Sequence, residues 1–270
     1  MTSIKRLGAL MLAVLPVACS LLVDTSGLAG DGEGDGGSRI DSSSFDGGAV
    51  TGDAAMGDGG ALDGAPDPLA DGLVGYWKFD ETGGTVVHDS SGNGNDGAMM
   101  PGATRAPGKV GGAVSFDGVR GYVEVPKSAS LVTTKVMTVT LWANLQLVTE
   151  DPRLVGRRDS WDTKINGNKP QLSLVDGEYA ISDVPIIAGA WHHLAFVFQD
   201  GKITIYVDGS PTPLGTDQTK ASGELPSDPG ELIMGAYPSS PESSFATGLL
   251  DEVRVYRRVL TADEVKTLAR

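Results

Sequence analysis

Short runs of β-branched and aromatic residues, rather than longer helical periods, dominate the chain after Leu73. These runs are bounded by Gly, Asn, Asp and Pro, which end strands and form turns. Strands at this density, with no helices between them, predict an all-β sandwich or jelly roll. The predicted strands are Leu73 to Phe79, Ala113 to Phe116, Gly121 to Val125, Val136 to Leu147, Gln171 to Val175, His192 to Phe198, Lys202 to Val207, Glu231 to Met234 and Leu249 to Tyr256.

One short helix is predicted at the C-terminal end. Thr261 is followed three residues later by Glu264, which is the spacing of a capping box. In that arrangement the threonine side chain and the glutamate side chain each accept a hydrogen bond from the other residue's backbone N–H. We therefore expect a helix to begin at Thr261.

The N-terminal segment has the layout of an export signal. Lys5 and Arg6 precede an uncharged run from Leu7 to Ala18, which is shorter than the roughly 20 apolar residues that span a bilayer. The run ends at Cys19 and resembles the lipobox of bacterial lipoproteins, although Pro16 departs from the usual leucine. The resemblance implies that residues 1–19 form a signal segment ending at a lipidated Cys19, and that the protein is exported and anchored to the outer membrane or cell surface. An ordinary signal peptide cleaved elsewhere is the alternative.

Residues 20–71 are dominated by Gly, Asp, Ser and Ala. They hold 11 acidic residues against Arg39 alone, a net charge of −10. Such a segment cannot bury enough apolar area to offset its chain entropy, so we predict a disordered linker. Calcium-binding repeats would need a fixed nine-residue period, which the segment lacks.

Composition narrows the function classes. The 270 residues carry a formal net charge of −14, which argues against a nucleic-acid partner because such proteins need a basic face. Cys19 is the one cysteine, so neither an intramolecular disulfide nor a cysteine zinc site can form.

Six segments after residue 72 carry a family resemblance. They are Gly75 to Glu81, Asp89 to Gly97, Gly112 to Gly118, Trp191 to Ala195, Ile205 to Gly209 and Leu250 to Tyr256. In this order they resemble bacterial laminin-G-like domains of the concanavalin A-like lectin and glucanase superfamily, over one domain at residues 72–270. The resemblance implies a jelly roll of two antiparallel sheets, found as a binding module on secreted or surface proteins. The same fold also carries glycosidases and lyases.

A structural Ca²⁺ site is the first candidate within this domain. Asp251 alternates with Val253 and Val255, so we expect its carboxylate to point inward. In the family the first and last strands lie close, which would bring Asp80 and the loop Asn93 to Asn95 near it. Carboxylate and amide oxygens from distant segments suit Ca²⁺. Asp80, Asn93, Asn95 and Asp251 are the predicted ligands. The alternative is that Asp251 accepts backbone N–H bonds and the loop is a plain turn.

A sugar site is predicted from aromatic residues. Trp142 falls among polar neighbours on one face of its strand, as a stacking platform would, although the resembled family also uses a tryptophan there for packing. Trp161, which we place in a loop after Arg158, and Tyr237, before Pro238, are further exposed candidates.

Sequence motifs give little support to catalysis. The paired carboxylates of glucanases, spaced E-x-D-x-E or E-x-D-x-x-E on one strand face, occur nowhere in the chain. We therefore expect a non-catalytic surface lipoprotein that binds a glycan or a cell-surface protein, with no nucleic-acid partner and membrane contact only through the lipid anchor. The alternatives are a structural or adhesive surface protein without a sugar ligand and, last, a polysaccharide-cleaving enzyme.

Overall fold

The computed structural model describes residues 69–146, 151–216, 223–227, 230–237 and 244–270, and the structural statements below refer to these residues. The expected signal segment, Cys19 and the linker up to residue 68 lie outside them. Within the described residues, no helix has the length and apolar character needed to cross a membrane.

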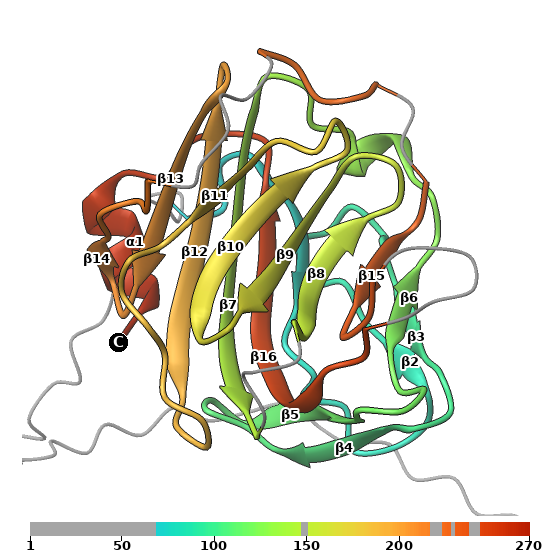
Figure 1. Ribbon diagram of the computed structural model, residues 1–270. Coiled ribbons are helices and arrows are strands. Elements are labelled where there is room, and N and C mark those ends of the chain that lie inside the picture. Colours follow the sequence, from blue (N-terminus) through green and yellow to red (C-terminus); the bar gives the residue numbers. More distant parts are fainter. Residues whose placement is uncertain (1–68, 147–150, 217–222, 228–229, 238–243) are drawn as a thin grey trace, which may run out of the picture. The chain divides into compact units, whose positions relative to one another are not determined.

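Two antiparallel sheets lie face to face (Figure 1). Sheet A contains β4 (Ala103–Pro107), β5 (Gly112–Asp117), β16 (Thr247–Tyr256), β7 (Val136–Leu145), β12 (His192–Gln199), β13 (Lys202–Val207) and β14 (Ser210–Pro211) in this spatial order, and β1 (Leu73–Trp77) also pairs with β16. Sheet B contains β2 (Val86–Val87), β3 (Gly97–Met99), β6 (Val123–Val125), β15 (Leu232–Met234), β8 (Arg153–Arg157), β9 (Trp161–Asn166), β10 (Lys169–Leu174) and β11 (Tyr179–Ile181). The predicted all-β jelly roll with two antiparallel sheets is confirmed.

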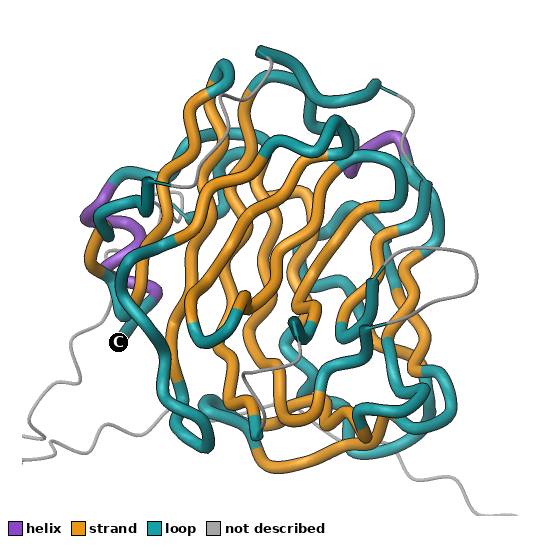
Figure 2. Tube along the Cα trace, viewed as in Figure 1, coloured by secondary structure: helices purple, strands orange, loops and turns teal. Residues whose placement is uncertain are grey.

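Strand is the main regular structure of the domain, as Figure 2 shows. Each of the nine predicted strands corresponds to an observed one, with small shifts at the ends. The short β2, β3, β4, β11 and β14 were not predicted, and neither were β8 and β9. Besides the strands, the described residues form the 3₁₀ helix η1 (Ala129–Leu131) and the helix α1 (Ala262–Leu268).

The apolar core fills the space between the two sheets. Along β7, Val139, Leu141 and Leu145 face this core and are almost fully buried, together with Phe196 and Phe198 of the neighbouring β12. Successive side chains of a strand point to opposite faces, so the residues between them face away from the core. Alternation of this kind leaves each sheet an outer face on which polar side chains can gather.

A β-bulge in β16 reverses the expected direction of Asp251. Leu250 and Asp251 pair with consecutive residues of β7, but the register then shifts before Arg254, and Glu252 takes a positive φ of 53°. The extra residue moves the following valines to the core side and leaves Asp251 opposite Trp142 on the outer face. The prediction that Asp251 points inward, made from strict alternation, was therefore wrong, although its carboxylate is buried.

The helix α1 covers part of the outer face of sheet A. A second apolar cluster joins Ala195, Val197 and Tyr256 of the sheet to Leu260 and to Val265 of the helix. The predicted capping box is confirmed, because the side chains of Thr261 and Glu264 each accept a hydrogen bond from the other residue's backbone N–H.

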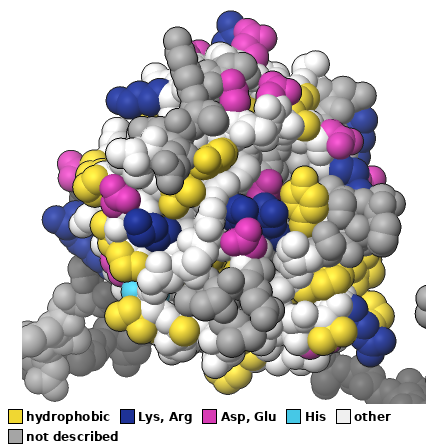
Figure 3. Space-filling view, viewed as in Figure 1, with side chains coloured by type: hydrophobic (Ala, Val, Ile, Leu, Met, Phe, Trp, Pro, Cys, Tyr) yellow, Lys and Arg dark blue, Asp and Glu magenta, His cyan; other side chains and the backbone are white. Residues whose placement is uncertain are grey.

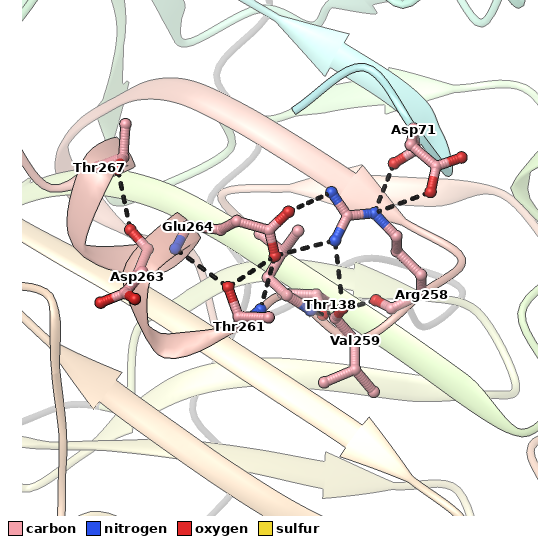
Figure 4. Close-up of polar contacts among 9 residues, drawn as sticks. Asp71, Thr138, Arg258, Val259, Thr261, Asp263, Glu264 and Thr267 are labelled. Atoms are coloured by element: carbon pink, nitrogen blue, oxygen red, sulfur yellow. Dashed lines mark hydrogen bonds and ion pairs between the residues drawn. The ribbon is translucent and has the colours of Figure 1, made fainter. Parts of the chain in front are cut away.

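Arg258 ties this helix to the beginning of the domain (Figure 4). Its guanidinium donates to both carboxylate oxygens of Glu264, at 2.7 and 3.0 Å, and to the backbone carbonyl of Asp71 at 2.7 Å. The hydrogen bond from Arg258 lowers the pKa of the Glu264 carboxyl to about 2. Segments 187 residues apart in sequence are therefore joined by one side chain.

We expect Glu264→Gln to lower the free energy of unfolding at neutral pH by about 1 kcal/mol, because the amide keeps the capping box but loses the charge facing Arg258. A folded-state pKa below the ordinary value stabilises the protein above pH 4.5, and this contribution is lost as pH falls toward 2. The difference between the variant and the wild type should therefore shrink over that window in denaturant titrations. Asp263→Asn, at an exposed carboxylate of the same helix turn, is the control; an equal effect there would contradict the assignment.

Candidate functional site

A pocket of about 630 Å³ opens on the outer face of sheet B, over β8 to β11. Its volume lies within the roughly 300 to 1,000 Å³ usual for small-molecule sites. Figure 3, viewed onto this face, shows Lys or Arg side chains beside Asp or Glu side chains near its middle, with hydrophobic side chains around them. The lining includes Arg153, Trp161, Asp162, Ser173, Tyr179 and Tyr237.

The strand register places the polar side chains of the pocket. Asp162 of β9 lies opposite Ser173 of β10, which lies opposite Tyr179 of β11. Residues opposite each other in a sheet share one face, so these three side chains form a row. One step along the strands, Arg153 of β8 lies opposite Lys164 of β9 on the same face.

Arg153 connects two groups of the pocket. Its guanidinium forms an ion pair with Asp162 and lies 4.5 Å from the centre of the Tyr237 ring, within the range of a cation–π contact. Burial raises the pKa of the Asp162 carboxyl, although the charge of Arg153 acts in the opposite direction. The pair thus holds a carboxylate and a cation together in a largely desolvated position.

Three residues that line the pocket each have a buried polar atom without a hydrogen-bond partner among the described residues. These atoms are Arg153 Nε, Ser160 Oγ and Trp161 Nε1. The residues Ser160 and Trp161 are only 2% and 3% exposed. Buried polar groups are normally hydrogen-bonded. The missing partners of these three atoms therefore favour a site in which a polar ligand supplies them.

Two of the three predicted sugar-site aromatics meet in this pocket. Tyr237 is 37% exposed, as expected, and lines the opening. Trp161 also lines it, but it begins β9 instead of lying in a loop, and its ring is buried. The expectation that Trp161 is exposed was therefore wrong, because its ring packs into the core while its strand forms the floor of the pocket.

Trp142 lies elsewhere and is not a platform for a sugar. It is on the outer face of sheet A and 6% exposed; its ring centre lies 5.4 Å from that of His193 in an edge-to-face arrangement and 4.4 Å from Lys109 Nζ. Burial lowers the pKa of His193 to about 4, so this imidazole is neutral at pH 7. The burial of Trp142 agrees with the packing role that the resembled family gives a tryptophan here, and not with a stacking platform.

Asp80 and Asp251 both contact the turn between β4 and β5. Asp251 Oδ2 accepts a hydrogen bond from Val110 N–H at 2.8 Å, and Asp80 Oδ1 accepts one from Gly112 N–H at 2.8 Å. A Cβ at Gly108 would lie 2.7 Å from Asp251 Oδ2, so this turn needs glycine to approach the carboxylate. The predicted approach of the first and last strands therefore brings these two carboxylates to one short segment.

Asn93 and Asn95 are not brought to these carboxylates. Asn95 Nδ2 donates to the carbonyl of Val74 at 2.7 Å, and Asn93 Nδ2 donates to the carbonyl of Leu73 at 3.1 Å. Both amides thus fasten their loop to the beginning of β1, whereas Asp80 follows the end of that strand. The prediction that all four residues share one site was wrong.

The residues at this turn fit a hard cation in part. Burial raises the pKa of the Asp251 carboxyl to about 6, and its Oδ1 is buried with no hydrogen-bond partner among the described residues. Two carboxylates and nearby backbone carbonyls are ligands that Ca²⁺ accepts. The described residues contain no cluster of three or more His, Cys, Asp or Glu side chains suited to a metal, so backbone oxygens would have to complete the shell.

Sequence reasoning missed most of the pocket. Arg153, Asp162, Ser173 and Tyr179 were not singled out, and β8 and β9 were not predicted. The available signal was the alternation in residues 161–166, where Asp162 and Lys164 fall between apolar or small residues. Such alternation is typical of a strand with one polar face.

Comparisons with known proteins agree with this architecture. Residues 117–266 match the family described as the concanavalin A-like lectin/glucanases superfamily. Over 106 residues the chain is 34% identical to adhesion G-protein coupled receptor V1 of Danio rerio. The aligned part is 39% of this chain and spans about 2% of that relative's length.

Two solved structures show the same fold. Domain 4 of AbnA, a GH43 extracellular arabinanase from Geobacillus stearothermophilus, solved in complex with arabinotriose, is similar with a TM-score of 0.59 and 22% identity, over 73% of this chain and 98% of that one. The binding domain of Paraclostridial Mosquitocidal Protein 1 is similar with a TM-score of 0.59 and 18% identity, over 74% of this chain and 52% of that one. At these identities the likeness concerns the fold alone.

Proposed function

Because the chain belongs to the concanavalin A-like lectin/glucanases superfamily, we propose that its jelly roll is a non-catalytic, lectin-like module that binds a glycan in the pocket on sheet B. The observation that carries the proposal is the lining of this pocket. It combines two tyrosines, Tyr179 and Tyr237, with the buried polar atoms that have no partner among the described residues. Sugars offer an apolar ring face and many hydroxyls, which such a lining complements.

The charge arrangement supports binding over catalysis. A glycosidase needs two carboxyl groups that flank the scissile bond as acid and base or nucleophile. Among the residues that line the pocket, Asp162 is held in an ion pair with Arg153, and Asp159 is exposed on the turn between β8 and β9. The solved arabinanase domain bound to arabinotriose offers a precedent for a sugar on this fold.

A protein partner is the second candidate. The similarity to an adhesion receptor favours it, since the domain would then serve in contacts between surfaces. The two functions differ in what they require of the pocket, because only glycan binding depends on its tyrosines.

We also propose a structural Ca²⁺ at the turn that Asp80 and Asp251 share. The unpartnered, buried Asp251 Oδ1 is the supporting observation. When bound, the ion would neutralise these carboxylates and fix the turn between β4 and β5, and it would take no part in chemistry.

The lipobox resemblance at Cys19 suggests how the module is displayed. We propose that a lipid on Cys19 anchors the chain and that residues 20–71 space the domain from the membrane. The acidic charge of this segment disfavours docking on anionic headgroups, so attachment would rest on the acyl chains.

Glycan binding should be measured on the full chain with an array of polysaccharides, followed by calorimetry on the best ligand. We expect Tyr237→Ala to weaken binding about tenfold, because it removes a ring face at the opening of the pocket. Val119→Ala, at an exposed apolar side chain on a turn of the domain, is the matched control and should bind like the wild type. Release of reducing ends from the bound glycan should stay at background. Silence across the array from folded protein would favour the protein partner.

Thermal unfolding with calcium or chelator tests the metal proposal. At pH 7.5 we expect saturating Ca²⁺ to raise the Tm of the wild type by about 5 °C, because the ion binds only the folded state. Asp251→Asn should lose this response, whereas Asp263→Asn on α1 should keep it. A wild-type Tm that calcium does not change would exclude the site.

Detergent phase partitioning of bacterial cells that express the chain tests the anchor. The wild type should enter the detergent phase and incorporate labelled palmitate, because lipidation adds acyl chains to the thiol. Cys19→Ser should do neither, and Ser20→Ala is the control. Incorporation of the label by the serine variant would contradict lipidation at this position.

A further inference from the structure

The charges around the pocket cancel. The cationic side chains that line it are Arg153, Arg157, Arg158 and Lys164, and the anionic ones are Asp159 and Asp162. Two further carboxylates, of Asp151 and Glu231, are ion-paired to lining cations. Four positive and four negative groups therefore leave the pocket close to neutral.

Most of the cations are held by groups of the protein. Arg153 pairs with Asp162, and Lys164 Nζ lies 3.0 Å from Asp151 Oδ2. Arg158 Nε lies 2.8 Å from Glu231 Oε2. An anionic ligand would have to compete with these carboxylates for Arg153, Lys164 or Arg158.

Arg157 is also committed to the protein. It is 1% exposed, and its guanidinium donates to the backbone carbonyls of Ser128, Leu131 and Gly230. Its role is to fasten the end of β8 to neighbouring loops. It stabilises the wall of the pocket without presenting a cation to a ligand.

The remaining hydrogen-bonding capacity is mixed. Arg153 Nε can only donate, the hydroxyl of Ser160 can do both, and the Asp162 carboxylate can accept. A sugar hydroxyl donates and accepts at once, so it can meet both kinds of group. A carboxylate or sulfate ligand can only accept, and it would face the carboxylates of Asp162 and Asp159.

We propose that the pocket selects uncharged, hydroxyl-rich glycans over carboxylated or sulfated ones, and that the Arg153–Asp162 pair forms hydrogen bonds with their hydroxyls. This inference rests on the proposed glycan binding and adds the class of sugar. The pair presents a donor and an acceptor in a fixed, largely buried geometry, so a hydroxyl that reaches both is oriented by two hydrogen bonds. An anion meets a repulsive carboxylate at the same place.

Two ligand sets separate the classes. Arabinan, galactan and β-glucan represent the uncharged glycans; polygalacturonate, heparin and sialylated oligosaccharides represent the charged ones. We expect the full chain to bind at least one uncharged glycan, with a Kd that changes less than about twofold between roughly 50 and 500 mM NaCl, because no net charge is neutralised. The charged set should bind at least about tenfold more weakly at either salt concentration.

Variants of the pair test its role. Asp162→Asn should weaken binding of the uncharged glycan at least about tenfold, because it replaces one acceptor oxygen with an amide donor and removes the charge that holds Arg153 in place. Asp263→Asn, at an exposed carboxylate on α1 and outside the pocket, should bind within about twofold of the wild type. The double variant Arg153→Gln with Asp162→Asn leaves no unpaired buried charge, so it keeps the test valid if the single variant does not fold, and it should lose binding as well.

These outcomes distinguish a failure of the preference for uncharged sugars from a failure of glycan binding itself. Preference for the charged set, with affinity that falls as salt rises, would overturn this inference and leave glycan binding in place. Equal effects of Asp263→Asn and Asp162→Asn would overturn the role of the pair. Failure of both glycan sets to bind a folded chain would remove the proposed function itself.

Discussion

Burial of one apolar layer between two sheets is the constraint on which the rest of the structure depends. Strands β7 and β12 of sheet A and β9 and β10 of sheet B each contribute alternate side chains to this layer. Since every second residue must face the core, the residues between are released from packing and can serve other purposes. On sheet A, much of the outer face is taken by α1 and by the buried group around Trp142, whereas sheet B keeps a pocket open. The outer faces of the two sheets therefore differ in how much of each is covered.

The sequence predicted the fold well and the site poorly, for one physical reason. Strands with a strong apolar face, such as β7 and β12, were recognised because burial dictates their composition. Strands β8 and β9 contribute fewer apolar residues and carry Arg153, Asp162 and Lys164 on their outer face. Polar residues on the outer face of a strand weaken the same pattern by which the strand is recognised, so the elements hardest to predict are those that carry the pocket.

Local irregularity explains the errors at the proposed metal site. Alternation predicts a side chain's direction only while the register is continuous, and one extra residue at Glu252 turns Asp251 to the other face. Asn93 and Asn95 have side-chain oxygens that could bind Ca²⁺, but their amide groups donate hydrogen bonds to backbone carbonyls of β1 and hold the loop there. Long-range proximity was nevertheless predicted correctly for Asp80 and Asp251, because it follows from the order of strands and not from side-chain geometry.

The clamp formed by Arg258 has a consequence for how such domains can be joined. It holds Asp71, where the described domain begins, next to the turn that leads into α1, where the domain ends. Both ends therefore belong to the sheet A side of the sandwich, and the pocket opens on the outer face of sheet B. A domain of this design can be placed within a longer chain, or repeated along one, with its pocket turned away from both junctions. Valency could then rise by duplication alone, without any change in the pocket.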